Sequence, residues 1–136
     1  DIHAALGLSQ LNRLHQYIEI RHEIAERYDE GFKDINLEVP FRDPSNKSAL
    51  HLYVIKVQPS QHKYVFNCLR KQDIGVNLHY IPVHTHPYYQ NLGFSWGDFI
   101  NSEAYYRRAI SLPLYPTLKS EEQKFIIDQI RLLIND

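Results

Sequence analysis

The chain has 136 residues, 43% of them apolar and 12% aromatic, which is enough to bury one core and predicts a single domain over 1–136. Its 15 Lys and Arg residues nearly balance 16 acidic residues, and no basic run is present, so nucleic acid is excluded as a partner. One cysteine excludes a disulfide framework and no apolar stretch reaches the roughly 18 residues of a membrane span, so we expect a reducing, cytoplasmic setting and no membrane contact.

The first part of the chain has helical periodicity. Apolar residues recur at helical spacing over 4–28 and predict one long amphipathic helix near 3–32 that stops at Gly31. The stretch that follows carries two prolines and an Asp-Pro-Ser-Asn turn cluster, which is typical of a connector. Because the chain lacks methionine and opens inside this helical pattern, we expect it to be part of a longer protein.

Short β-rich segments alternate with helices after the connector. The predicted strands lie near 50–57, 76–81 and 109–114. The predicted helices lie near 61–72, 98–107 and 120–134. The last helix opens with a capping-box pattern, Ser120 followed by Gln123. This order predicts an α+β fold in which one three-stranded, mainly antiparallel sheet packs against helices.

The segment from His79 to Phe94, "HYIPVHTHPYYQNLGF", concentrates the ring side chains of the sequence. Its three histidines have the spacing H-x4-H-x-H, which matches no common zinc motif, so we assign no metal ligand. Cys68 lies between Phe66 and Leu69 and is predicted to be a packed apolar residue rather than a nucleophile. The residue types leave two alternatives open for the segment: a packed turn, or a polar loop that faces a ligand.

Four stretches carry a resemblance to a known family. In chain order they are "DIHAALGLSQLNRL", "SALHLYVIKV", "GVNLHYIPVHTHPYY" and "SLPLYPTLKSEEQKFIIDQI". Together they resemble the C-terminal part of the DegT/StrS family of nucleotide-sugar aminotransferases. The resemblance implies that 1–136 is the small C-terminal domain of a fold type I PLP-dependent transferase, which works as a homodimer with active sites at the subunit interface.

The resemblance also implies a substrate and a set of binding residues. The residues "HYIPVH" and "LPLYPTL" are most similar to those of the branch that serves the biosynthesis of pseudaminic acid. Pseudaminic acid is a nonulosonic acid of surface polysaccharides. That branch implies transfer of an amino group, with glutamate as the expected donor, to a UDP-linked 4-keto-6-deoxy-N-acetylhexosamine. The side chains implied to approach this substrate are those of His79, Tyr80, His84 and Tyr88.

The resemblance implies no catalytic role for any residue of this chain. The family's catalytic lysine, which carries pyridoxal phosphate, has no counterpart among the seven lysines here. We therefore expect the chain alone to be inactive and assign it no catalytic, cofactor-binding or metal residue. Two alternatives to an aminotransferase domain remain: a non-catalytic binding or dimerisation module, and a family member that is a sugar dehydratase.

Overall fold

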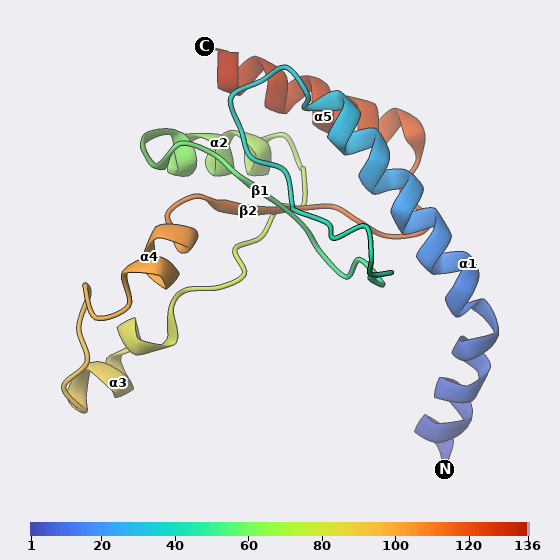
Figure 1. Cartoon of the computed structure of the whole chain (residues 1–136), viewed down its shortest axis with the longest axis horizontal. Coiled ribbons are helices and arrows are strands. Elements are labelled where there is room, and N and C mark those ends of the chain that lie inside the picture. Colours follow the sequence, from blue (N-terminus) through green and yellow to red (C-terminus); the bar gives the residue numbers. More distant parts are fainter. Residues whose placement is uncertain (136) are drawn as a thin grey trace.

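The computed structural model describes residues 1–135 and consists of helices packed around a small sheet. The elements in chain order are α1 (Ile2–Gly31), β1 (Tyr53–Lys56), α2 (Pro59–Lys71), the 3-10 turn η1 (Val83–Thr85), α3 (Pro87–Asn91), α4 (Ile100–Tyr106), β2 (Ala109–Leu112) and α5 (Ser120–Asn135). In Figure 1, α2 and α5 lie on one side of the two strands, and α3 and α4 lie on the other side. The four predicted helices are present as α1, α2, α4 and α5.

The sheet has two strands. β1 and β2 are antiparallel, and Tyr53 pairs with Leu112. The prediction of a third strand over 76–81 is wrong: within the described residues this segment makes one bridge to β2, between Asn77 and Ser111. The next carbonyl on this edge of β2, that of Ala109, accepts a hydrogen bond from the His62 ring at 3.0 Å and is therefore not free to continue the pairing. The antiparallel direction is as predicted.

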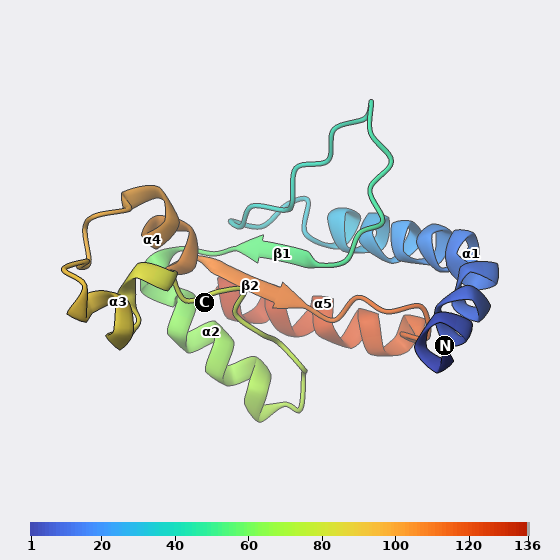
Figure 2. The same ribbon diagram turned by 90° about the horizontal axis from the view of Figure 1, so that it is seen from below.

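Alternation along the strands separates two faces of the sheet. One face of the sheet is buried and forms a single core with α2 and α5. The strands contribute Tyr53, Ile55, Ile110 and Leu112, and the helices contribute Val65, Leu69, Ile126 and Ile130. Val54 and Ser111 pair with each other and point to the opposite face. We call this opposite side the open face, since α2 and α5 do not cover it (Figure 2).

The second half of α1 packs closely against α5. Gln123 of α5 is almost fully buried, donates a hydrogen bond to the Ile24 carbonyl at 2.7 Å and accepts one from Arg27 at 2.7 Å. A Cβ added at Gly31 would lie 2.8 Å from the side chain of Ile127, so glycine is what allows this approach. Gln123 therefore joins two helices and does not form the predicted capping box. The backbone N–H of Lys119 is instead bonded by Glu122, at 3.1 Å.

The first half of α1 extends past the rest of the fold. A helix of 30 residues is about 45 Å long, whereas strands of four residues span about 13 Å. The sheet can therefore cover only part of the helix, and Figure 1 shows its N-terminal half projecting away. The predicted apolar stripe is present, but Leu8, Leu11 and Leu14 on it are exposed, by 69%, 57% and 40%.

Candidate functional site

The histidine-rich segment leaves the edge of β2 and enters a small module of short helices. Asn77 and Ser111 exchange two backbone hydrogen bonds, of 2.9 and 3.1 Å. Two residues further on, Nδ1 of His79 lies 2.7 Å from the Ser111 hydroxyl, and this fixes the imidazole against the open face of the sheet. The chain then runs through η1, α3 and α4, which we call the loop module, residues 80–107, before it returns as β2.

Tyr80 and Tyr88 are the predicted site residues that face solvent. The Tyr80 side chain is 73% exposed, and its ring stands edge-on against the ring of His79 with centroids 4.5 Å apart. Tyr88, on α3, is 68% exposed and stands edge-on against Tyr89 at 5.2 Å. His79 is half-buried: its ring is anchored through Nδ1 and remains partly accessible to solvent. These three side chains can donate hydrogen bonds and offer ring faces to a bound sugar.

His84 occupies a different environment from the other three. Its side chain is 8% exposed, and its Nε2 lies 3.0 Å from the Glu103 carboxylate. The imidazole also packs against Phe99, with ring centroids 4.7 Å apart. The ring is buried and one of its nitrogens is engaged within the protein, so for His84 the geometry favours the packed-turn alternative over direct ligand contact.

Glu103 is the hub of the loop module. Besides His84, it accepts a hydrogen bond of 2.6 Å from the backbone N–H of Gly97 and pairs with Arg107 at 3.4 Å. Burial raises the pKa of this carboxyl, but the hydrogen bonds from Gly97 and His84 outweigh that effect, so the net pKa lies below its usual value. Glu103 is therefore held as a carboxylate, and its charge binds three parts of the module together.

Rings surround this hub and leave an aromatic surface. Arg107 stacks over the Trp96 ring, 5.7 Å from its centroid. Phe94 and Phe99 have centroids 6.2 Å apart, and both remain partly exposed. Sequence reasoning missed Glu103, Trp96 and Ser111 as parts of the site. No local pattern signals them, because each meets the histidine segment only through the tertiary fold.

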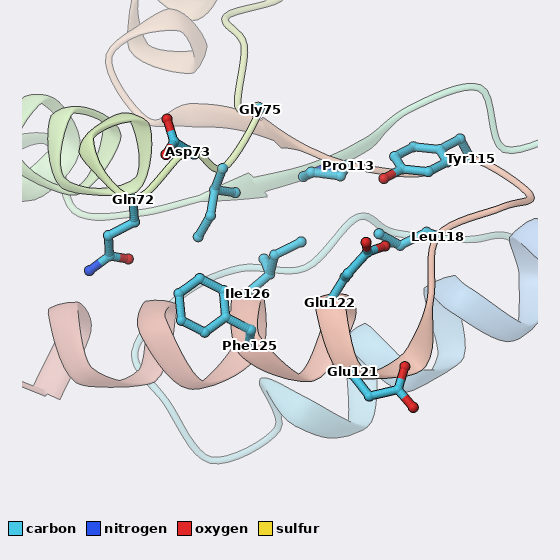
Figure 3. A pocket seen from close by; sticks show the side chains of 11 residues that line it. Gln72, Asp73, Gly75, Pro113, Tyr115, Leu118, Glu121, Glu122, Phe125 and Ile126 are labelled. Atoms are coloured by element: carbon cyan, nitrogen blue, oxygen red, sulfur yellow. The ribbon is translucent and has the colours of Figure 1, made fainter.

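One hollow on the helix side does not suit the predicted substrate. It has a volume of about 440 Å³ and lies between the end of α2, the end of β2 and the start of α5 (Figure 3). Asp73, Glu121 and Glu122 are among its lining residues, whereas Lys, Arg and His are absent from that lining. A phosphate-bearing ligand would be repelled there. The four predicted site residues also lie outside it.

The residues present do not form a site for pyridoxal phosphate or a metal. Six of the lysines are exposed, and the seventh, Lys56, is half-buried but paired with Glu38. A lysine that carries a cofactor needs an enclosed setting that lowers its pKa. Within residues 1–135, no group of three or more His, Cys, Asp or Glu side chains is gathered for a metal, and no helix is long and apolar enough to cross a membrane. Cys68 is half-buried and packs against the core.

Comparisons with known proteins point to one family. The DegT/DnrJ/EryC1/StrS aminotransferase family matches residues 1–131. Spore coat polysaccharide biosynthesis protein SpsC of Bacillus subtilis is 39% identical over 98% of this chain and 36% of its own length. A UDP-4-amino-4,6-dideoxy-N-acetyl-beta-L-altrosamine transaminase of Helicobacter pylori is 33% identical over 96% of this chain and 36% of its own length.

Solved structures agree with these matches. Spr1654 of Streptococcus pneumoniae, in its PLP form, superimposes with a TM-score of 0.90 at 30% identity, over 97% of this chain and 35% of that one. Helicobacter pylori PseC, an aminotransferase involved in the biosynthesis of pseudoaminic acid, gives a TM-score of 0.86 at 29% identity, over 96% of this chain and 36% of that one. The chain thus spans about a third of the length of the relatives it matches.

Proposed function

Because this chain belongs to the DegT/DnrJ/EryC1/StrS aminotransferase family, we propose that the intact protein transfers an amino group to a nucleotide-linked keto sugar, with residues 1–136 as its small C-terminal domain. The family match over 1–131 is the observation that carries this proposal. It is supported by relatives that are named as sugar transaminases and by a related structure in its PLP form.

The proposed acceptor is a UDP-linked 4-keto-6-deoxy-N-acetylhexosamine and the proposed donor is glutamate. Support for the acceptor comes from the transaminases of Helicobacter pylori and Campylobacter jejuni, whose names give the 4-amino sugar that such a reaction produces. The match to SpsC supports a role in polysaccharide biosynthesis. The reaction exchanges the sugar's carbonyl oxygen for the donor's amine and releases 2-oxoglutarate.

We propose that this domain contributes substrate binding. Pyridoxal phosphate is held by parts of the intact enzyme outside this chain. The intact enzyme acts as a homodimer. No step of the amino transfer is assigned to a side chain here. The binding residues are His79, Tyr80 and Tyr88, which present a ring N–H and two phenol groups to solvent. His84, the fourth residue predicted from the sequence, acts through Glu103 by bracing the loop.

Incubation of the intact protein with pyridoxal phosphate, glutamate and the UDP-linked 4-keto sugar tests the proposal. We expect a sugar nucleotide with a 4-amino group, detected by mass spectrometry, and an equal amount of 2-oxoglutarate. An unchanged keto sugar would overturn the proposed activity in favour of a binding module. Loss of water from the sugar without uptake of nitrogen would overturn it in favour of a dehydratase.

A further inference from the structure

The stretch 79–84, which carries two of the proposed binding residues, His79 and Tyr80, is fastened at both ends to a single segment of the chain. At its start, Nδ1 of His79 lies 2.7 Å from the hydroxyl of Ser111. At its end, Nε2 of His84 lies 3.0 Å from Glu103. Between the two anchors, Tyr80 is 73% exposed. Glu103 and Ser111 belong to the continuous segment that leads from α4 into β2, so the spacing of the two anchors is set by that segment.

The hydrogen at the first anchor can be assigned from burial. Ser111 is 4% exposed, and His79 is the one partner of its hydroxyl among residues 1–135. Leaving a buried hydroxyl hydrogen without an acceptor costs free energy, so the hydroxyl donates its hydrogen to Nδ1 of His79. A neutral imidazole carries one ring hydrogen, which must then be on Nε2.

We propose that Ser111 and Glu103 are positioning residues: Ser111 holds His79 as the Nε2–H tautomer, so that His79 donates a hydrogen bond to an acceptor oxygen of the ligand, and Glu103 fixes the far end of the same loop. This rests on the proposed binding role of His79. Nε2 of His79 has no protein partner within the described residues and is therefore the ring atom free to meet a ligand. The oxygens of a sugar diphosphate and of its sugar are acceptors of this kind.

The second anchor holds the chain that follows His79. Glu103 draws together η1 through His84, the turn at Gly97 and the end of α4 through Arg107. If this hub loosens, the chain between the anchors can move while His79 stays bonded to Ser111. Variants of Ser111 and of Glu103 should therefore both raise KM for the keto sugar. In the Glu103 variant the cause is displacement of Tyr80.

Nuclear magnetic resonance of the intact protein with ¹⁵N-labelled histidine tests the tautomer without any need for activity. Long-range proton–nitrogen spectra, recorded where the imidazole is neutral and assigned with a His79→Gln variant, distinguish the two tautomers. We expect the Nε2–H form in the wild type and in Ser111→Thr, and a mixture in Ser111→Ala. Nδ1–H as the main form of the wild type would overturn the proposal.

Kinetics test the positioning role. For Ser111→Ala and Glu103→Gln we expect KM for the keto sugar to rise by about three- to tenfold, the loss that one hydrogen bond to a ligand produces, with kcat nearly unchanged. The half-reaction with the amino donor serves as an internal control and should be unaffected. Ser111→Thr, which keeps the hydroxyl, should restore KM, and Ser102→Ala, on the exposed side of α4, should match the wild type.

Two results would contradict this reasoning. An equal loss in both half-reactions would show that the variants disturb the whole enzyme, and an unchanged KM in Ser111→Ala would show that the tautomer of His79 has no effect on binding. A protein that does not transaminate any keto sugar would instead refute the proposed function. The nuclear magnetic resonance result would still decide the tautomer in that case.

Discussion

Replacing Gln123 by alanine should weaken the contact between α1 and α5. Its amide makes two hydrogen bonds of 2.7 Å, one to the Ile24 carbonyl and one from Arg27, and the side chain is 1% exposed. Each of these bonds contributes about 1 kcal/mol net. Truncation of a buried side chain also leaves a cavity that costs about 1 kcal/mol or more. We therefore expect the free energy of unfolding to fall by about 2 to 4 kcal/mol.

Urea unfolding of the 136-residue chain, followed by circular dichroism, measures this loss. Gln123→Leu provides a variant of similar size that keeps the packing and removes both hydrogen bonds. Its cost should be smaller than that of alanine, because Arg27 is exposed and can bind water, and the Ile24 carbonyl remains in the hydrogen-bond ladder of α1. Lys124→Ala is the matched control: it removes an exposed ion pair with Asp128 on the same helix and should cost no more than about 0.5 kcal/mol.

The outcome for alanine decides whether the amide joins the helices. If Gln123→Ala unfolds at the same urea concentration as Lys124→Ala, the buried amide does not hold α1 against α5 and the reasoning is refuted. If Gln123→Leu costs as much as alanine, the hydrogen bonds rather than the packing account for the loss.

Four further predictions concern the loop module and the lysines. In the intact protein, Tyr80→Phe should raise KM for the keto sugar by about two- to tenfold and leave thermal unfolding unchanged, because its phenol is exposed. Conversely, His84→Ala should lower the melting temperature by several degrees, since a buried partner of Glu103 is lost, whereas exposed His86→Ala should not; equal melting temperatures would contradict the role given to His84. Because the pKa of Glu103 is lowered, its carboxylate stabilises the fold above pH 4.5, the unperturbed value, and this stability is lost as the pH falls further. The urea midpoint of Glu103→Gln should therefore fall less between pH 6 and pH 3 than that of the wild type. Parallel curves for the two proteins would refute this. Borohydride reduction of the chain with pyridoxal phosphate should label no lysine stoichiometrically, because none is enclosed; one specific labelled lysine in the mass spectrum would show otherwise.

Periodicity was sufficient for four of the five α-helices that the structure describes; it missed the short α3 and failed where pairing depends on a neighbouring strand. Four helices were predicted within about two residues of their observed limits. The segment 76–81 has the composition of a strand, yet it leaves the sheet after Asn77, and the His62 ring bonds the Ala109 carbonyl with which it would pair next. A competing hydrogen bond from a histidine 47 residues away has no signal in the local sequence. Only the fold shows that it is used here.

The long first helix shows a second limit of sequence reasoning. Its apolar spacing correctly predicts a long amphipathic helix, but an apolar face is not always a buried one. The sheet and α5 reach only its second half, where Ile24, Ala25 and Tyr28 are buried, while Leu8 and Leu11 are exposed. Spacing reports that a face is apolar. It carries no information on whether the rest of the chain is long enough to cover that face.

Two histidines five residues apart show why the site could be predicted only in part. Both were expected to approach a substrate, and by type and local sequence they are equivalent. His79 is held by one nitrogen, and the other has no partner among residues 1–135, because Ser111 is a hydroxyl at the edge of the open face. His84 is enclosed because its partner is the buried carboxylate of Glu103. Neither partner is a sequence neighbour, since they lie 32 and 19 residues away. Under the proposed function, the same segment is a packed turn at His84 and a ligand-facing loop at His79, and this division is what allows a rigid anchor to hold an exposed Tyr80 in place.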